Sequence, residues 1–230
     1  HFTLDDNLAM TEERKQQLAS QYTGRYKSIY ILGLRVAACG AIYDNFDRAN
    51  NVFSGDVSNA LRDSQHYIAC DYGTVNPCVF LDCASTEDGV VYVLREYRWD
   101  SRLRMAQKTD AAYVQDMIKF AGAPESCDAI IIVDPSAVSF INALRAEGFF
   151  VKPANNDVLN GIMKVSSLIG QKRLKIHESC TGLIAGMEGY SWDERSVNSG
   201  VEKPLKIRDH APDALRYYVN TCLSSFDITR

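Results

Sequence analysis

The segment 66-HYIACDYGTVNPCVFLDCASTEDGVVYVLREYRWD-100 consists of three apolar runs joined by short polar connections. Each run is rich in β-branched and aromatic residues, which is typical of strands. Gly73 ends the first run, and Asp88-Gly89, between the second and the third, is a typical hairpin turn. Because antiparallel neighbours are joined by such short turns, the segment predicts a meander of three antiparallel strands.

Helices and further strands follow this meander. AIIIVDPSA at 129–137 is a continuous apolar run, as in the centre of a parallel sheet that is covered on both faces. The other predicted elements are helices over 105–122, 136–148, 157–171 and 180–192 and from about Ala211 to Ser224, and strands over 149–154 and 173–179. This order predicts an α/β fold of the ribonuclease-H-like class, with a mixed sheet and helices on both faces. A doubly wound nucleotide-binding fold fits less well, because it needs strand–helix alternation from the start.

The chain divides into a preamble and one larger domain. TEERKQQLASQY predicts a helix with Thr11 as its N-cap, and a region rich in Asn, Asp and Ser follows without a sustained period. We therefore expect 1–60 to be a linker and 61–230 to be the folded domain. The chain does not begin with methionine, so we expect it to be a piece of a longer protein.

Composition indicates a globular protein of a reducing cytoplasm. The 230 residues are 46% hydrophobic and 23% charged, and no apolar run approaches the roughly 20 residues that span a bilayer. The N-terminal residues are mixed and polar, unlike a signal peptide. None of the seven cysteines belongs to a C-x-x-C pair, and most lie in apolar stretches, which favours buried, reduced thiols.

Three aspartates occupy special positions in the predicted fold. Asp71 ends the first strand of the meander, Asp134 ends the central strand, and Asp213 lies near the start of the final helix. Strand ends of an open mixed sheet lie beside one another at one edge, and a helix N-terminus can dock against that edge. We therefore expect the three carboxylates to converge, although they are far apart in the sequence.

These acids also have purely structural explanations. Asp71 can open a turn, and Asp134 can cap the helix that follows it. Asp209 suits a helix cap or a group that orients a ligand. Asp213 is harder to explain in this way, because it lies off the apolar stripe of its helix and one turn from His210, so that both side chains share one side.

Carboxylates held close together repel one another, and their pKa values rise unless a cation is present. A hard divalent ion such as Mg²⁺ or Mn²⁺ relieves this repulsion, because it prefers oxygen ligands. Two such ions, roughly 3.5–4 Å apart, can activate a water and stabilise the leaving oxygen in phosphodiester hydrolysis. The predicted cluster therefore indicates a metal-dependent nuclease.

Several motifs resemble those of one known family, over nearly the whole chain. They are CDYG, IIVDPSA with the following LRAEGF, NNDVLNGI, YSWDE, the pair KP and DHAPDALRYY. Together they resemble the C-terminal nuclease domain of the large terminase subunit of tailed double-stranded DNA bacteriophages. In the preamble, FTLDDN and GAIYDNFD resemble the segment that joins the ATPase motor of that family to its nuclease. The DHxxDALRY ending with an upstream DP strand is the more specific part.

The resemblance implies an endonuclease that cuts concatemeric viral DNA at the start and end of genome packaging. It places the family's acidic triad at Asp71, Asp134 and Asp213. His210 is then an auxiliary ligand or proton carrier, unless it only caps or orients, and Asp209 orients a ligand. In this assignment Asp71 is shared by two Mg²⁺ or Mn²⁺ ions, and the other two acids hold one ion each.

The resemblance also implies partners. These are double-stranded DNA, the small terminase subunit, the portal and the ATPase domain of the same subunit, in the cytoplasm of a bacterial host and without a membrane. The sequence contains no G-x-x-x-x-G-K-[ST] motif, so we do not expect this chain to hydrolyse ATP.

Basic residues near the sheet edge are candidates for contacts with DNA phosphates, although long basic side chains are also common on solvated surfaces. The candidates are Lys152, Lys164, Lys172, Arg173, Lys203, Lys206 and Arg208. The net charge of −4 and the sequence pI near 5.6 argue against a dedicated nucleic-acid binder, so we expect low, salt-sensitive affinity. No segment is suited to reading base edges, which predicts cutting that is largely independent of sequence.

The polar segment 191–206, interrupted by Gly200 and Pro204, predicts a hairpin insertion just before the final helix. Its composition and position suggest the hypothesis that it limits access to the acids. Two alternative functions remain open. One is a Holliday-junction resolvase or transposase-like nuclease of the same fold, and the other is a catalytically silent packaging module that docks the motor to the portal.

Overall fold

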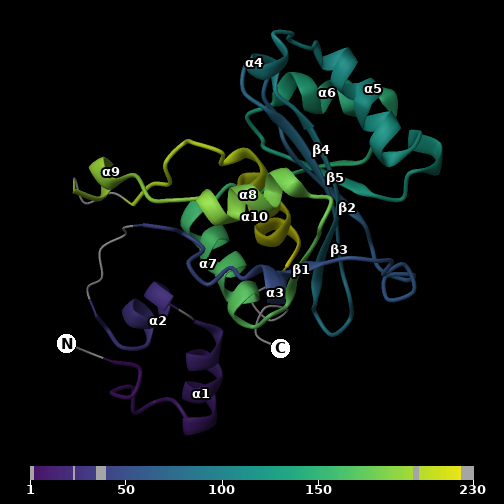
Figure 1. Ribbon diagram of the computed structural model, residues 1–230. Coiled ribbons are helices and arrows are strands. Elements are labelled where there is room, and N and C mark those ends of the chain that lie inside the picture. Colours follow the sequence, from purple (N-terminus) through teal and green to yellow (C-terminus); the bar gives the residue numbers. More distant parts are fainter. Residues whose placement is uncertain (1–2, 23, 35–39, 199–201, 224–230) are drawn as a thin grey trace.

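The computed structural model describes residues 3–22, 24–34, 40–198 and 202–223 (Figure 1). The described residues form a seven-stranded mixed sheet in the order β1-β7-β4-β3-β2-β5-β6. The strands are β1 Val52–Phe53, β2 Tyr67–Asp71, β3 Cys78–Ser85, β4 Val91–Trp99, β5 Ile130–Val133, β6 Val151–Pro153 and β7 Leu174–His177. The helices are α1 Glu12–Gln21, α2 Gly24–Tyr30, α3 Arg48–Asn51, α4 Ser101–Arg104, α5 Asp110–Ala121, α6 Val138–Glu147, α7 Val158–Gly170, α8 Thr181–Gly189, α9 Glu194–Asn198 and α10 His210–Cys222, with a 3₁₀ turn at Pro124–Ser126.

The strands β2, β3 and β4 confirm the predicted antiparallel meander. Tyr67 of β2 lies opposite Cys83 of β3, and Cys78 of β3 lies opposite Trp99 of β4. Gly89 in the β3–β4 turn has a φ of 79°, a left-handed conformation that favours glycine. Local turn chemistry and apolar runs therefore determine the centre of the sheet.

Parallel strands flank the meander on both sides. β5 pairs with β2 and β6 pairs with β5, while β7 pairs with β4 and β1 pairs with β7. The apolar run at 129–137 contains β5, whose last three residues are buried, as expected for an inner parallel strand. The sheet is therefore mixed, as predicted.

Two groups of helices cover the two faces of the sheet (Figure 1). α5 and α6 pack on one face, over a core that includes Phe80 and Phe140. α7, α8 and α10 pack on the other face, over a core that includes Leu81 and Leu215. Phe80 and Leu81 are adjacent in β3 and enter different cores, because successive side chains of a strand point to opposite faces.

Side-chain caps shift the helix boundaries from the predicted ones. The Thr109 hydroxyl accepts a hydrogen bond from the Ala112 N–H, so α5 begins at Asp110 and the predicted start at 105 is wrong. The short helix α4 precedes it, and Met105, with a φ of 49°, ends that helix in the left-handed conformation.

Part of the predicted linker packs against the domain. Thr11 caps α1 as predicted, and its hydroxyl accepts from the Arg14 N–H. Further along, Ile42 and Tyr43 are buried in the core on the α10 face, and β1 extends the sheet beside β7. The boundary near residue 60 stays a prediction. Cys39 of the predicted linker lies outside the described residues.

The two ends of the segment 191–206 run antiparallel to each other. Trp192 and Pro204 form an isolated bridge, and the Asp193 N–H donates to the Lys203 carbonyl at 2.9 Å. α9 lies between these ends, and residues 199–201 lie outside the described residues. The hairpin therefore stays a prediction, but its paired ends lead directly into α10.

The six described cysteines are free thiols, and those at 70, 78, 83 and 180 are buried, in agreement with the predicted reduced state. Among the residues that the structure describes, no helix combines the length and apolar character needed to cross a bilayer. The predicted end of the last helix at Ser224 lies outside the described residues, and α10 extends to Cys222.

Candidate active site

The sheet register places Asp71 and Asp134 side by side at the carboxyl ends of two neighbouring strands. β2 and β5 are parallel, and Cys70 lies opposite Val133, so the two acids are the next residues along. Ala69, two residues before Asp71, belongs to the core on the α10 face. Since side chains alternate along a strand, Asp71 faces α10 as well.

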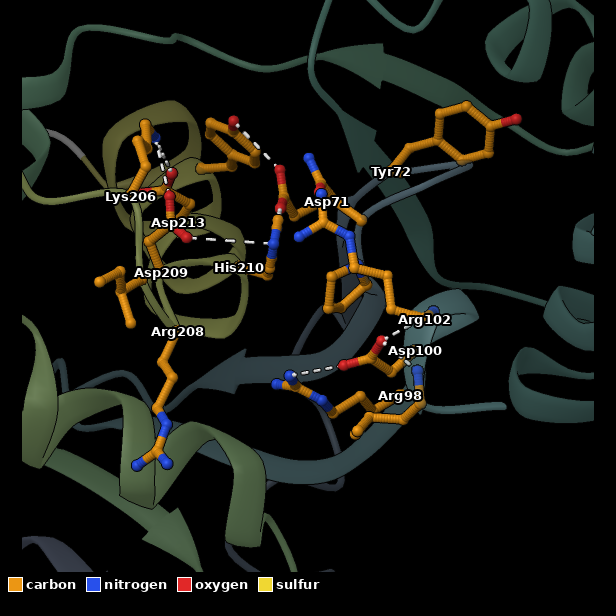
Figure 2. Close-up of a pocket in the computed structure, with 16 residues that line it drawn as sticks. Asp71, Tyr72, Arg98, Asp100, Arg102, Lys206, Arg208, Asp209, His210 and Asp213 are labelled. Atoms are coloured by element: carbon orange, nitrogen blue, oxygen red, sulfur yellow. Dashed lines mark hydrogen bonds and ion pairs between the residues drawn. The ribbon is translucent and has the colours of Figure 1, made fainter. Parts of the chain in front are cut away.

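The start of α10 brings polar side chains to this edge. His210 Nδ1 lies 2.7 Å from Asp71 Oδ2, and Figure 2 shows His210 facing Asp71 from the first turn of the helix. The Tyr217 hydroxyl donates to Asp134 Oδ2 at 3.0 Å and lies 3.4 Å from Asp71 Oδ1. Tyr217 therefore connects the two strand-end carboxylates to α10.

The two oxygens of Asp134 have different partners. Oδ1 accepts from the Ser136 N–H at 2.8 Å, in the turn that leads to α6. The N-cap of α6 is Ala137, without a side-chain capping hydrogen bond, so the interpretation of Asp134 as a helix cap is wrong. Oδ2 accepts from the Tyr217 hydroxyl and from the Asn156 amide. Asp134 is 9% exposed, and these bonds orient its second oxygen toward the side of the sheet that carries α10.

Asp213 is buried, with 4% of its surface exposed, and it accepts from three donors. The Tyr190 hydroxyl donates to Oδ1 at 2.9 Å, and Lys206 Nζ donates to Oδ2 at 3.0 Å. Arg216 lies behind the carboxylate, with Nη2 at 3.3 Å from Oδ1. Such charge-assisted contacts fix the position of a buried carboxylate.

Asp209 stands at the N-cap position of α10, but its side chain makes no capping hydrogen bond. Its Oδ2 lies 3.0 Å from Lys206 Nζ, and its Oδ1 lies 4.0 Å from His210 Nε2. The interpretation of its side chain as a helix cap is therefore wrong. The carboxylate is instead one of the acids that surround Lys206.

Negative charge in this cluster changes the titration of its members. Burial raises the pKa of Asp71 above its usual value, and the charges of Asp213 and Asp209 raise it further, against the hydrogen bond from His210. Burial lowers the pKa of His210, but its hydrogen bond to Asp71 and the negative charge there outweigh burial and raise it. The acids therefore repel one another, and a cation relieves that repulsion.

The described residues include no group of three or more His, Cys, Asp and Glu side chains arranged to hold a metal ion. The acids that converge are instead engaged by donors from the protein. Their chemistry still suits a hard divalent ion, because carboxylate oxygens are the ligands that Mg²⁺ and Mn²⁺ prefer. The ammonium of Lys206 contacts Asp209 and Asp213.

A cleft of about 690 Å³ opens beside these groups. Its lining includes the acids Asp71, Asp209 and Asp213 with His210, and the basic residues Arg98, Arg102, Lys206 and Arg208. Figure 2 shows Arg98 and Arg102 across from Asp209 and Asp213. Asp100 lies on the same side as these two arginines, with Oδ2 at 3.6 Å from Arg98 Nη2. Among the described residues, Asp134 does not line the cleft.

No family model matches the sequence, but the similar proteins and the similar solved structures are both phage large terminases. The large terminase of the thermophilic bacteriophage D6E, solved in complex with ATP-gamma-S, is 40% identical, with a TM-score of 0.87; the match covers 96% of this chain and 55% of that one. The large terminase subunit of Escherichia phage T5 is 29% identical over 190 residues, 77% of this chain and 41% of that one. This chain is a homologue of phage large terminase subunits. It spans about half the length of these relatives.

Two terminase nuclease domains share the fold of this terminase homologue. The P22 nuclease domain is 17% identical, with a TM-score of 0.63 over 79% of this chain and 91% of that one. The nuclease of thermophilic phage G20c with bound magnesium is 13% identical, with a TM-score of 0.58 over 77% of this chain and 95% of that one. At these identities the likeness shows the fold, and it confirms the predicted ribonuclease-H-like class.

The structure separates the basic residues that were predicted to contact DNA. Lys206 and Arg208 line the cleft, whereas Lys164 donates to the Leu223 carbonyl at 2.9 Å. Arg173 donates to the Gly89 carbonyl at 3.0 Å, in the β3–β4 turn. None of Lys152, Lys164, Lys172, Arg173 and Lys203 lines the cleft.

Sequence reasoning missed Arg98 and Arg102, and an irregularity in the sheet hides the position of Arg98 from a count along the strands. Asp71 pairs with Val79 in β3, and Val79 pairs with Arg98 in β4. Residues directly opposite each other in antiparallel strands share a face of the sheet. A bulge between Asp82 and Cys83 shifts this register by one residue, so counting from the predicted turn would have placed Tyr97 and not Arg98 opposite Val79.

Proposed function

We propose that this chain is the nuclease domain of a phage large terminase, a divalent-metal-dependent endonuclease that cuts concatemeric viral double-stranded DNA during genome packaging. The observation that carries the proposal is that Asp71 and Asp134 lie side by side at the carboxyl edge of a sheet with the terminase-nuclease fold, and that Asp71 and Asp213 line one cleft. Three acids from distant segments, joined through the residues of α10, favour a built site over three independent turns and caps.

The proposed metal ligands are Asp71, Asp134 and Asp213. Asp71 would be shared by two ions, and Asp134 and Asp213 would hold one each. The G20c nuclease was solved with bound magnesium and with bound cobalt, which supports a divalent ion, Mg²⁺ or Mn²⁺, in this chain. When bound, such ions stabilise charge on the phosphodiester and activate the attacking water. No dedicated protein base is then required.

The remaining polar residues position these carboxylates. Tyr217 holds Asp134 and lies within 3.4 Å of Asp71, so both acids keep a fixed orientation toward α10. His210 holds the other oxygen of Asp71 through Nδ1 and keeps Nε2 on the side of Asp209. This arrangement supports His210 as an auxiliary ligand or proton carrier and Asp209 as an orienting group.

Arg98, Arg102 and Arg208 are the proposed contacts with the DNA backbone, because they line the same cleft as Asp71 and Asp213. Arginine suits phosphate, since its planar guanidinium can donate two parallel hydrogen bonds. Such contacts position a duplex without reading bases, which supports cutting that is largely independent of sequence. Because the net charge of the protein is −4, DNA is attracted locally, by these three arginines, and not by the protein as a whole.

Replacing Arg98 and Arg102 together by Ala is expected to weaken binding of a linear duplex and to lower the slope of log affinity against log salt by about 2, one unit for each phosphate contact. Fluorescence anisotropy across a salt series measures both quantities. The double variant Arg62→Ala, Lys172→Ala removes the same charge from outside the cleft and should leave the slope almost unchanged. Equal losses in the two double variants would show a general charge effect and contradict the assignment.

We also propose that the small terminase subunit, the portal and the ATPase domain are partners, in the cytoplasm of the bacterial host. The relatives from D6E and T5 are longer than this chain, and the D6E terminase was solved with a nucleotide analogue, which supports a motor beside the nuclease. The segment 191–206 is proposed to limit access to the cleft, because it ends at Lys206, which lines the cleft.

Nicking and linearisation of supercoiled plasmid with Mn²⁺, Mg²⁺ or EDTA tests the proposed function. We expect cutting with either ion, none with EDTA, and products without a preferred sequence. A strong preference for four-way junctions over linear duplex would favour a resolvase. If there were no cutting and no saturable Mn²⁺ binding in a folded protein, the chain would be a docking module instead.

A further inference from the structure

The ammonium of Lys206 lies between two buried carboxylates of the proposed site. Nζ is 3.0 Å from Asp209 Oδ2 and 3.0 Å from Asp213 Oδ2, and Figure 2 shows Lys206 beside Asp213. Both acids are only 4% exposed, so water contributes little to balancing their charge. Two buried carboxylates that share one cation depend on it strongly, because an uncompensated buried charge is costly.

Lys206 differs from the acids in its access to solvent. Its side chain is 70% exposed, whereas those of Asp209 and Asp213 are 6% and 5% exposed. It lies in the non-helical stretch before α10, between Leu205 and Ile207, which are both exposed. The ammonium is therefore held from the solvent side, at the end of a long flexible stem, and it can leave without moving the core.

Asp209 and Asp213 have their charges matched without a metal ion, although Asp71 adds negative charge beside them. Asp209 and Asp213 face the cations Lys206 and Arg216. A divalent ion at the Asp213 oxygen that Nζ contacts would lie close to the ammonium, and one of the two cations must move away because like charges repel. Arg216 is 1% exposed and enclosed by the core, so Lys206 is the cation that is able to move.

We propose that Lys206 occupies the cation position of the site when no metal is bound, and that a divalent ion displaces it, so that Lys206 sets the affinity of the site for metal. The inference rests on the proposed function, because it requires that a divalent ion binds at Asp213. Lys206 then competes with that ion for Asp213. The site then stays compact without metal, at the expense of weaker metal binding.

Titration of Mn²⁺ by isothermal calorimetry into wild type, Lys206→Met and Lys203→Met tests the inference. Lys203 is the matched control, since it is exposed and carries the same charge in the same segment. We expect Lys206→Met to bind Mn²⁺ about tenfold more tightly than Lys203→Met, which should stay close to wild type. Plasmid cutting is not needed for this readout.

Urea unfolding gives a second readout that does not depend on activity. Without metal, Lys206→Met is expected to unfold at lower urea than Lys203→Met, because Asp209 and Asp213 lose their shared cation. Excess Mn²⁺ should remove or reverse this difference, since ligand binding stabilises the folded state by RT ln(1 + [Mn²⁺]/Kd), which is larger for the variant that binds more tightly.

Mn²⁺ affinity of Lys206→Met equal to or below that of Lys203→Met would overturn the inference and would indicate a fixed role for Lys206, such as a phosphate contact. Failure of the proposed function looks different. In that case wild type and Asp213→Asn bind Mn²⁺ equally weakly, which would remove the metal site and the competition for it together. Mn²⁺ binding that depends on Asp213 but not on Lys206 would overturn the inference alone.

Discussion

Replacing Asp71 by Asn is expected to lower metal-dependent plasmid cutting roughly 100- to 1,000-fold or more, the loss typical when one preorganised charge-stabilising group is removed. Asp71 has the largest expected effect among the acids, because it is the proposed ligand of both ions. An amide oxygen still accepts a hydrogen bond from His210, so the change removes charge while it keeps shape. Saturable Mn²⁺ binding should weaken in parallel.

The fold is expected to tolerate this substitution. Burial and the negative charges of Asp213 and Asp209 raise the pKa of Asp71, so the ionised carboxylate is less favourable in the folded state than in the unfolded chain. The contribution of Asp71 to stability is therefore present below its unfolded pKa and decreases as the pH rises toward its folded pKa. A neutral amide avoids this penalty at neutral pH, and urea unfolding without metal should show no loss of stability.

The matched control is Asp88→Asn, the same chemical change at an exposed position in the β3–β4 turn, outside the cleft. It should cut plasmid at the wild-type rate. Wild-type cutting by Asp71→Asn with the same ion would contradict the proposed ligand set. Loss of cutting in both variants would point to a general effect of charge or to a contaminating nuclease.

The strand-end acids were predictable because their positions follow from local patterns. Asp71 and Asp134 each end an apolar run, and the carboxyl ends of neighbouring parallel strands meet at one edge of the sheet. Asp213 followed from the amphipathic pattern of its helix. Strand periodicity and helix periodicity are short-range properties, so a single sequence is enough to reveal them.

The contacts of the basic residues were not predictable in the same way. Arg173 binds the β3–β4 turn because β7 lies beside β4 in the sheet, a neighbour relation that no local pattern reveals. Lys206 reaches Asp209 and Asp213 because of the path of a non-helical stretch. Such contacts depend on how distant segments pack, and long side chains have many rotamers to choose from.

Replacing Arg216 by Met is expected to lower the free energy of unfolding by about 3–5 kcal/mol, the typical cost of breaking a buried ion pair by removing one partner. Arg216 is 1% exposed and lies 3.3 Å from Asp213. Its Nη1 also donates to Asn156 Oδ1 at 3.3 Å, and Asn156 donates in turn to Asp134. The substitution therefore deprives Asp213 and Asn156 of the buried guanidinium that donates to them.

The packing around Arg216 is adapted to this side chain. A Cβ atom on Gly161 of α7 would lie 2.3 Å from Arg216 Cγ, so the glycine provides the space for the arginine stem. The guanidinium also lies 4.8 Å from the centre of the Tyr217 ring. Lysine has no planar fork with which to reach both Asp213 and Asn156, so Arg216→Lys should recover only part of the lost stability.

Arg48→Met is the matched control for Arg216→Met, because it removes the same cation from an exposed pair. Arg48 Nε lies 2.6 Å from Glu188 Oε1, with side chains 64% and 43% exposed, so its loss should cost at most about 1 kcal/mol. Urea unfolding of both variants without metal gives the comparison. Mn²⁺ titration adds a second readout, since Arg216 connects Asp213 to Asn156 and thereby to Asp134, and its loss should weaken binding even where the protein remains folded. Equal small costs for the two variants, with unchanged Mn²⁺ affinity, would show that the buried arginine fills space and does not position the acids.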